Sequence, residues 1–439
     1  MDRALPEIKL PRARQAFVLG WPYTNLGGVN AVVRSLVREF SNSGPLAPLV
    51  MEVVPSSVHG ASLDELPLLR IDLLPPYDAR RPWRSFLSFC VHLGPHLWRL
   101  RRICRTERIK VLNPHFIGLT HFALMLFRRT VWRKGKLVFS FHGSDLRAMM
   151  QSRGLERLLL RLLVRGADRL VACSEGLADE LRAFAPECAG RITAIHNGIN
   201  IDSFVGSADP QFRLPEHFST RTKLVSVGAF EAKKAHEVMI RAFAQVRRAR
   251  PDAALIIAGQ AGAQLAATRQ LVRELGLESD VHLLVDIPHP HIAALLQTAN
   301  VFVLSSQWEK GVCGEGFAIA LLEAAAARIP VVSTESCGVR ELITHGESGL
   351  LVPPGRPELL AEAVQALLAD PNEAARQAAN LHDKARRQFT WQSAHRQYLA
   401  LVGMSDTEIA SRACPLNEYG RKTAHRTSAA VPAWPSPDG

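Results

Sequence analysis

Two glutamates, Glu315 and Glu323, stand eight positions apart in the run Glu-Gly-Phe-Ala-Ile-Ala-Leu-Leu-Glu, which follows the apolar residues 301–304. If that run is helical, a rise of 1.5 Å per residue separates the two carboxylates by about 12 Å. The paired acids of glycoside hydrolysis lie roughly 5 to 10 Å apart. The spacing therefore favours two carboxylates that hold opposite ends of one long polar ligand.

The residues between the two glutamates fit an anionic ligand as well. Gly316, Phe317 and Ala318 stand at the expected start of the helix, where backbone N–H groups and the helix dipole favour a diphosphate. Glu323 lies inside the apolar run 321–327, where a buried carboxylate is costly unless it has a partner. A surface helix that carries two glutamates by chance is the alternative.

A glycine pair, Gly27-Gly28, follows the apolar run 16–19 and precedes the helical pattern 29–40. Because glycine has no Cβ, backbone N–H groups at such a helix start are open to a phosphate. An ordinary tight turn explains the pair equally well.

His142-Gly143-Ser144-Asp145 follow the strand-like run 137–141. This places His142 at the carboxyl edge of a sheet, where open α/β sheets bind their ligands. Taken singly, a histidine at such a position is more often structural. Asp145 either caps the next helix or supports the site.

The composition is that of a large globular protein with one basic half. The chain has 439 residues, 47% of them hydrophobic, and a net charge of +12. Residues 1–200 hold 29 Lys and Arg against 16 Asp and Glu, whereas residues 201–439 hold 24 against 25. A one-sided basic half usually faces a phosphorylated substrate, acidic lipid headgroups or nucleic acid, although solvated arginines that maintain solubility give the same count.

The seven cysteines are scattered and show no C-x-x-C spacing, so neither a disulfide framework nor a zinc site is indicated. The sequence shows no signal-peptide core, no apolar stretch near the roughly 20 residues of a spanning helix, and no D-x-D metal motif. We therefore expect a cytoplasmic protein that needs no metal or cofactor and could touch a membrane without crossing it.

Strand-like and helical runs alternate along the chain, which predicts two doubly wound α/β domains with parallel sheets. Expected strands are residues 16–19, 50–54, 111–112, 137–141, 169–173, 192–195, 223–227, 254–258, 281–285, 301–304, 331–333 and 349–352. Expected helices are 29–40, 237–248, 266–275, 292–299, 317–327 and 357–368. We predict a first domain at 1–205, a linker at 206–222, a second domain at 223–390 and a disordered tail at 404–439.

Eight motifs in family order resemble glycosyltransferase family 4, retaining enzymes of the GT-B fold that use nucleotide-sugar donors. The resemblance covers roughly residues 16–403 and rests on Gly27-Gly28-Val29, His142-Gly143-Ser144-Asp145, Cys173-Ser174-Glu175, His196-Asn197-Gly198-Ile199, Val227-Gly228 with Lys233-Lys234, Glu315 to Glu323, Ala325 to Val332, and Gly349 to Pro354. It implies two Rossmann-like domains that face each other across a cleft. Residues 1–205, completed by a C-terminal helix at about 391–403, would form the N-terminal acceptor-side domain, and residues 223–390 would form the nucleotide-sugar-binding domain.

The resemblance also implies roles for individual residues. Glu315 would hold the hydroxyls of the donor sugar, and Glu323 the ribose diol. Lys234 would offset the charge on the departing diphosphate, and His142 would lie beside the donor sugar and support positive charge at the anomeric carbon. Gly228 would belong to the donor site, and Asn197 would close the last junction of the first domain.

Three positions depart from the family pattern. Ala229 stands where an arginine is usual, Ala235 where a glycine is usual, and Asn200 where an aspartate is common. Losing a bidentate arginine removes stabilisation of a developing phosphate charge. Either another cation, such as Arg340 or Lys310, substitutes for it, or activity is reduced.

Two basic regions remain. Arginines recur every four residues at Arg153, Arg157, Arg161, Arg165 and Arg169, opposite Leu155, Leu158, Leu159, Leu162 and Leu163, which predicts a solvated face on a packed helix. Residues 80–102 and 128–136 mix arginine and lysine with tryptophan, as membrane-surface segments do. Because the family places its acceptor on the first domain, we expect a lipid-linked or polyanionic glycan acceptor there.

The sequence thus predicts a hexosyltransferase that acts with retention in cell-surface polysaccharide or glycolipid synthesis, cytoplasmic and peripheral on the inner face of the plasma membrane. Its expected partners are a nucleotide-sugar donor, a glycan or lipid-linked acceptor and an anionic membrane surface. The alternatives are a nucleotide-sugar-binding protein with weakened or lost transfer, and a nucleotide-sugar 2-epimerase of the same architecture. A nicotinamide dehydrogenase is disfavoured because no G-x-G-x-x-G follows the first strand, and no nucleic-acid reader module is present.

Overall fold

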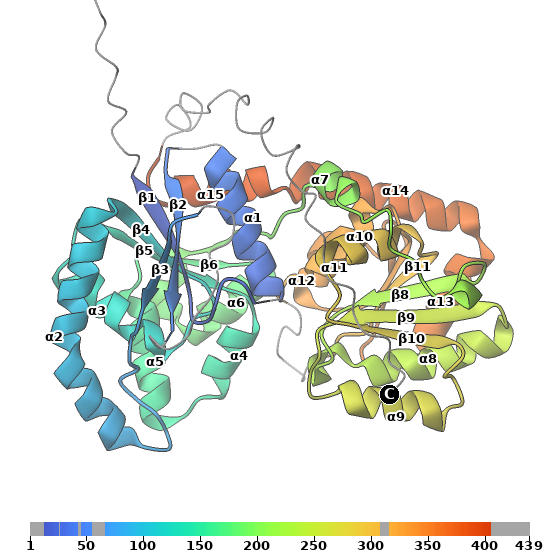
Figure 1. Ribbon diagram of the computed structural model, residues 1–439, viewed down its shortest axis with the longest axis horizontal. Coiled ribbons are helices and arrows are strands. Elements are labelled where there is room, and N and C mark those ends of the chain that lie inside the picture. The colour runs from blue at the N-terminus through green and yellow to red at the C-terminus, as the bar shows by residue number, and fades with distance from the viewer. Residues whose placement is uncertain (1–12, 26, 43–44, 55–65, 308–315, 405–439) are drawn as a thin grey trace, which may run out of the picture.

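The computed structural model describes residues 13–25, 27–42, 45–54, 66–307 and 316–404. Two lobes lie side by side, and each is built on a parallel sheet covered by helices (Figure 1). The α/β fold with two doubly wound sheets is therefore confirmed. Glu315 and Lys310 lie outside the described residues, as do the cysteines at 313 and 414.

The first lobe has a seven-stranded sheet in the order β3-β2-β1-β4-β5-β6-β7. Its strands are β1 (Arg14–Leu19), β2 (Ala47–Val53), β3 (Leu68–Ile71), β4 (Ile109–Pro114), β5 (Lys136–Phe141), β6 (Arg169–Ala172) and β7 (Ile192–Ala194). The central strands are buried on both faces, which is why they read as short apolar runs. The edge strand β3 was not predicted because it is only partly buried and carries Arg70, which pairs with Glu52.

Helices of the first lobe pack through one apolar face each. In α1 (Gly28–Asn42) the buried residues Val32, Val33, Leu36, Val37 and Phe40 follow the helical period. The other helices are α2 (Pro82–Thr106), α3 (Phe122–Thr130), α4 (Ser144–Gln151), α5 (Gly154–Gly166) and α6 (Glu175–Phe184), with 3-10 turns at Leu119–His121 and Pro186–Arg191. The short helix α7 (Ile201–Gly206) follows β7 and lies on the second lobe, where it contacts α10 (His289–Gln297) and α11 (Ile319–Ala326) (Figure 1).

The second lobe has a six-stranded sheet in the order β10-β9-β8-β11-β12-β13. Its strands are β8 (Thr222–Val227), β9 (Ala253–Gly259), β10 (Val281–Val285), β11 (Val301–Leu304), β12 (Val331–Thr334) and β13 (Leu350–Val352). Its helices are α8 (His236–Ala249), α9 (Leu265–Glu274), α10 (His289–Gln297), α11 (Ile319–Ala326), α12 (Cys337–Leu342), α13 (Pro357–Ala369) and α14 (Pro371–Gln388), with 3-10 turns at Glu216–Phe218 and Ala232–Lys234. No sequence pattern had indicated α14.

The chain crosses back to the first lobe at its C-terminal end (Figure 1). Helix α15 (Trp391–Leu401) packs against α1, and the Tyr398 hydroxyl lies 3.0 Å from Ser140 Oγ on β5. At the crossing, Ile199 N donates to the Phe389 carbonyl at 2.9 Å. A Cβ on Gly198 would lie 2.2 Å from Trp391 N, so only glycine permits this approach.

Two expectations about helices were wrong. Helix α11 begins at Ile319, so Gly316, Phe317 and Ala318 precede the helix instead of forming its first turn, and the rise of about 12 Å between the two glutamates does not apply. On α5, five leucines were expected to pack. Leu163 is buried and Leu159 packs against the core, but Leu155, Leu158 and Leu162 are exposed.

Replacing Gly198 with alanine tests the lobe crossing. The added Cβ would collide with the backbone at the start of α15, so we expect Gly198→Ala to lower the free energy of unfolding by about 1–3 kcal/mol. Gly190→Ala is the matched control because a Cβ there meets nothing within 4 Å. Denaturant unfolding measures both variants, and equal stability of the two would contradict the close approach.

Candidate functional site

The two lobes touch where His142 follows β5. A Cβ on Gly316 would lie 2.6 Å from the His142 carbonyl oxygen and 2.9 Å from Cys173 Sγ. Conversely, a Cβ on Gly143 would lie 3.3 Å from Gly316 N. The backbones of two predicted site segments, one from each lobe, therefore meet directly, and bare glycines make this contact possible.

Asp145 shapes the turn that carries His142. Its Oδ1 accepts the backbone N–H groups of His142 at 3.0 Å, Gly143 at 2.9 Å and Leu146 at 3.0 Å, and its Oδ2 accepts Ile117 N at 3.1 Å. Burial raises the pKa of Asp145 to about 6, and these hydrogen bonds oppose the rise. The residue sits in the first turn of α4 without capping it, so of the two expected roles the structure fits support of the site.

His142 belongs to a buried chain of polar side chains. Its Nε2 lies 3.0 Å from His115 Nδ1, and the two rings stack with centroids 5.2 Å apart. His115 Nε2 lies 3.2 Å from Asn113 Oδ1. Asn113 Nδ2 in turn donates to the Val138 carbonyl and to Ser140 Oγ, both at 2.9 Å.

This chain fixes the tautomer of His142. The Val138 carbonyl can only accept, so Asn113 must present Oδ1 to His115, and His115 must donate from Nε2. Burial lowers the pKa of His142 to about 4 and that of His115 well below its usual range, so both rings are neutral at pH 7. Neutral His115 then accepts at Nδ1, and His142 carries its proton on Nε2 and a lone pair on Nδ1.

Glu323 lies on α11, buried and paired. Its Oε1 is 2.8 Å from Nε2 of His289, the first residue of α10, and only 9% of the Glu323 side chain is exposed. The hydrogen bond that His289 makes to the Glu323 carboxylate raises the pKa of His289. Burial opposes the rise, and so do the positive charges of Arg34 and Arg38 on α1. The partner that a carboxylate in this apolar run requires is therefore His289, which no sequence pattern had indicated.

Gly27 and Gly28 stand at the start of α1, as predicted. Gly27 adopts a φ of +134°, and a Cβ on it would lie 3.3 Å from Gln260 Oε1 in the second lobe. Arg34 Nη1 donates to the carbonyls of Tyr23 at 3.2 Å and Asn25 at 3.3 Å, which holds the loop before the glycines. The helix start therefore faces the other lobe.

Lys234 runs alongside Gly228, the residue after β8. A Cβ on Gly228 would lie 3.3 Å from Lys234 Cδ, so glycine leaves room for the lysine stem. Ala235 adopts the left-handed conformation with φ +46°, which explains why a glycine suits this position. The Ala229 carbonyl lies 3.2 Å from His236 Nε2, and the Ala229 methyl supplies no charge.

Of the two candidate replacement cations, Lys310 lies outside the described residues. Arg340 forms an ion pair with Glu335 on the surface. Lys233 instead reaches the lobe junction: its Nζ lies 3.0 Å from Glu231 Oε2 and 3.4 Å from Ser144 Oγ at the start of α4. No sequence pattern had indicated Lys233 as a site residue.

Asn197 is buried beside Gly198 at the lobe crossing, behind the site. Its neighbour His196 bonds to Glu341 of α12, whose carboxylate also accepts the N–H groups of Glu175 and Gly176 at 3.0 Å each. Glu341 thus joins the second lobe to the start of α6. Phe317 packs between the lobes as well, with its ring 5.2 Å from His196 and 5.3 Å from Phe389.

Across the described ranges, no cluster of three His, Cys, Asp or Glu side chains has metal-binding geometry. Likewise, none of the helices in the described part of the chain is long and apolar enough to cross a membrane.

Each lobe matches a family model of glycosyltransferases. Residues 26–203 match the model of Glycosyltransferase Family 4, and residues 209–387 match the model of the Glycosyl transferases group 1. The chain belongs to glycosyltransferase family 4 and has the GT-B fold.

Several characterised proteins are similar to this chain. A glycogen synthase of Mycobacterium tuberculosis is 32% identical over 53% of this chain and 53% of its own length. A GDP-mannose-dependent alpha-(1-6)-phosphatidylinositol monomannoside mannosyltransferase of Mycolicibacterium smegmatis is 30% identical over 55% of this chain and 63% of its own length. The matches thus span between about half and two thirds of these relatives.

Two solved structures share the fold. Sucrose-phosphate synthase of Thermosynechococcus elongatus superposes with a TM-score of 0.71 at 21% identity, covering 89% of this chain and 98% of that one. HepE of Anabaena, solved in complex with UDP, superposes with a TM-score of 0.67 at 18% identity, covering 88% of this chain and 98% of that one.

Asn113→Leu tests the polar chain behind His142. The variant leaves the buried His115 N–H and the Val138 carbonyl without a partner, so we expect the free energy of unfolding to fall by roughly 1–3 kcal/mol per lost partner. Long-range proton–nitrogen NMR should show the Nε2–H tautomer of His142 in the wild type and a mixture in the variant. An Nδ1–H tautomer in the wild type would contradict the assignment.

The pKa values of His142 and His289 are shifted in opposite directions, so the two residues should change the stability of the fold with pH in opposite senses. The pKa of His142 is lowered to about 4, so the native state binds fewer protons there than the unfolded chain, and this site loses stability as pH falls below 6.5. The pKa of His289 is raised, so the His289–Glu323 pair stabilises below pH 6.5 and loses that stabilisation as pH rises through the folded pKa.

The comparison of wild type with His289→Gln isolates the second effect. The difference in unfolding temperature between the two should be larger at pH 5.5 than at pH 9, and NMR titration should place His289 above 6.5. A constant difference across this pH range would show that the pair carries no pH-dependent stabilisation.

Proposed function

We propose that this protein is a retaining glycosyltransferase that moves a hexose-type sugar from a nucleotide-sugar donor to a glycan or lipid-linked acceptor. The direct backbone contact between Gly316 and His142 carries the proposal, because it brings donor-site segments of both lobes to one place. Relatives named for mannosyl transfer from GDP-mannose, and the complex of HepE with UDP and glucose, support it.

The donor is proposed to lie along the lobe junction. An ionised carboxylate only accepts hydrogen bonds, so Glu323 suits the two hydroxyl donors of a ribose diol, with His289 holding the carboxylate in place. Glu315 is proposed to bind the sugar hydroxyls. The N–H groups of Gly316, Phe317 and Ala318 and the start of α1 at Gly27 and Gly28 are proposed to receive the diphosphate.

Charge placement fits a front-face substitution. As the bond to the diphosphate breaks, negative charge grows on the leaving group and positive charge grows at the anomeric carbon. Lys234 offsets the first, and Lys233, which reaches Ser144 at the junction, is proposed to substitute for the arginine absent at Ala229. His142 is neutral at pH 7, so its ring does not repel the second.

We propose that transfer needs no metal, because Lys234, the start of α1 and the N–H groups of Gly316, Phe317 and Ala318 would meet the diphosphate. Activity that persists in a chelator is the expected result, and activity that requires an added divalent cation would contradict this part of the proposal.

The acceptor is proposed to bind the first lobe and to be lipid-linked or polyanionic, because the excess positive charge of the chain lies in that half. We further propose that the protein is cytoplasmic, meets an anionic membrane surface from that side and acts in cell-surface polysaccharide or glycolipid synthesis.

Ala229 favours a second candidate, a nucleotide-sugar-binding protein with weakened or lost transfer, because the missing guanidinium removes transition-state stabilisation more than ground-state binding. A nucleotide-sugar 2-epimerase of the same architecture is a third. Release of free nucleoside diphosphate only when an acceptor extract is present indicates transfer, whereas formation of an epimer without acceptor indicates the third candidate.

Thermal shift against UDP, GDP, ADP and their sugars tests donor binding. A nucleotide at 100 times its dissociation constant should stabilise the native state by about 2.7 kcal/mol. Glu323→Gln and Lys234→Ala should remove most of the shift, each judged against its own apo stability. Glu362→Gln on the exposed side of α13 and Lys110→Ala at the far edge of the first lobe should keep it.

Loss of the shift in the control variants, or its full retention in Glu323→Gln, would contradict the proposed site. For a productive donor and acceptor, NMR of the product should show the anomeric configuration of the donor. An inverted product would contradict retention.

A further inference from the structure

Exposed apolar side chains gather on one side of the first lobe. Of eleven large hydrophobic residues that are exposed in the described part of the chain, nine lie on α2, on α5 or at Val131 just after α3. On α2 these are Trp83, Phe86, Leu87, Val91 and Trp98, and on α5 they are Leu155, Leu158 and Leu162. Helix α3 contacts both α2 and α5, so the three helices form one layer.

Helix α2 has exposed apolar residues in addition to those that it packs into the core. The opposite side of the helix supplies Phe89, Leu100 and Cys104 to the buried core. Trp83 is 84% exposed and Trp98 is 64% exposed, and both lie on a helix that exposes Phe86, Leu87 and Val91 as well. A patch of this kind on a soluble lobe marks an interaction site.

The charge around this stripe has one sign. Helix α2 contains no acidic residue over its 25 positions, whereas arginines follow the apolar stripe at Arg84, Arg99, Arg101, Arg102 and Arg105. A solvated surface helix normally mixes both signs. A basic amphipathic helix with tryptophans on its apolar side is typical of a helix that lies in a bilayer interface.

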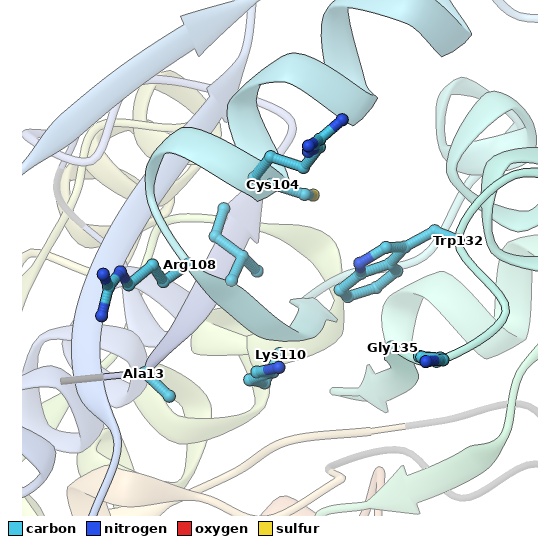
Figure 2. A pocket seen from close by; sticks show the side chains of 9 residues that line it. Ala13, Cys104, Arg108, Lys110, Trp132 and Gly135 are labelled. Carbon is cyan, nitrogen blue, oxygen red and sulfur yellow. The ribbon is translucent and has the colours of Figure 1, made fainter.

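A basic pocket continues this surface at the C-terminal end of α2. Its volume is about 450 Å³, and it lies where β1, β4 and β5 begin, at the edge of the sheet opposite the candidate site. Arg105, Arg108, Lys110 and Lys134 line it together with Trp132. Figure 2 shows Arg108, Lys110 and Trp132 among the side chains that line this pocket. No acidic side chain lines it, so it suits a phosphate.

We propose that α2 and α5, with this pocket, form a docking face for a bilayer that contains anionic lipids. The tryptophans of α2 and the leucines of α5 enter the interface, and the arginines meet lipid phosphates. Helix α2 lies at the end of the molecule away from the second lobe, so docking leaves the lobe junction open (Figure 1). This face deepens the proposed function, since it would bring the first lobe to a lipid-linked acceptor.

Charge decides against a second copy of the chain as the occupant. Helix α2 and the pocket carry no acidic side chain and α5 carries one, Glu156, so an acidic partner suits this face. Residues 201–439 carry a charge near zero, and the first half is itself basic. An anionic bilayer supplies both the negative charge and the apolar layer that Trp83 and Trp98 require.

Vesicle binding of the full chain, without donor or acceptor, tests the proposal. Vesicles of phosphatidylcholine alone are compared with vesicles that contain phosphatidylglycerol as well, at low and high salt. We expect binding to the anionic vesicles only, weakened by salt, and quenching of tryptophan fluorescence by brominated acyl chains. The double variant W83A/W98A should bind at least about tenfold more weakly and lose most of the quenching.

Matched variants in the second lobe serve as controls. L275A removes an exposed leucine, and the pair R269E and R273E reverses two exposed arginines on α9. These should bind as the wild type does, whereas R84E, R101E and R102E together should abolish the preference for anionic vesicles. Arg102 stacks over Trp98 at 5.8 Å, so R84E with R101E alone is measured as well.

Three results would overturn the proposal: equal binding to neutral and anionic vesicles, unchanged binding of W83A/W98A, or a dimer in light scattering that W83A/W98A converts to a monomer. Unchanged thermal shifts with nucleotides in every variant of this face show that such a failure belongs to the docking face and leaves the donor site untouched.

Discussion

The site depends on one steric constraint, the direct contact between the backbones of the two lobes. Gly316 has no room for a Cβ because the His142 carbonyl and the Cys173 sulfur occupy that space. Glycine is therefore required at 316 for a reason that precedes any ligand. With the lobes in this contact, His142 from one sheet and the loop before α11 from the other border the same space. Gly198 applies the same constraint at the chain crossing, where α15 returns to the first lobe.

Behind this contact, buried hydrogen bonds in the first lobe fix the backbone turn at His142 and the tautomer of its ring. Asp145 collects four backbone N–H groups and so sets the turn, while the chain from Asn113 through His115 sets the proton of His142. In both, hydrogen bonds between buried polar groups offset the cost of removing those groups from water. Glu323 follows the same rule through His289.

Much of this architecture could be predicted from sequence because its signals are local. The predicted runs for β5 and β8 ended where those strands end, so the strand-end rule placed His142 and Gly228 at the carboxyl edges of their sheets. His115 follows β4 in the same way, but the predicted run 111–112 stopped short of the end of this strand at Pro114. The expected helix at 317–327 began too early because apolar periodicity cannot distinguish a loop that packs between lobes from a first helical turn. Phe317 is apolar because it contacts His196 and Phe389.

Other features had no signal in the sequence because they arise from contacts between distant segments. His289 and Glu323 are 34 positions apart, and Lys233 meets Ser144 from the other lobe. The leucines of α5 were predicted to form one packed face, yet Leu163 is buried while Leu155, Leu158 and Leu162 are exposed. A helical period defines which residues share a face, but it does not say which of two apolar faces the rest of the fold covers.

The central claim is that one nucleotide-sugar is held by both lobes at once. A crystal structure with a non-transferable nucleotide-sugar tests it most directly. We expect the ribose hydroxyls to lie within hydrogen-bonding distance of Glu323. The diphosphate should contact Lys234 and the N–H groups of residues 316–318, and the sugar should lie beside His142. A nucleotide bound away from the lobe junction, or contacting one lobe only, would contradict it.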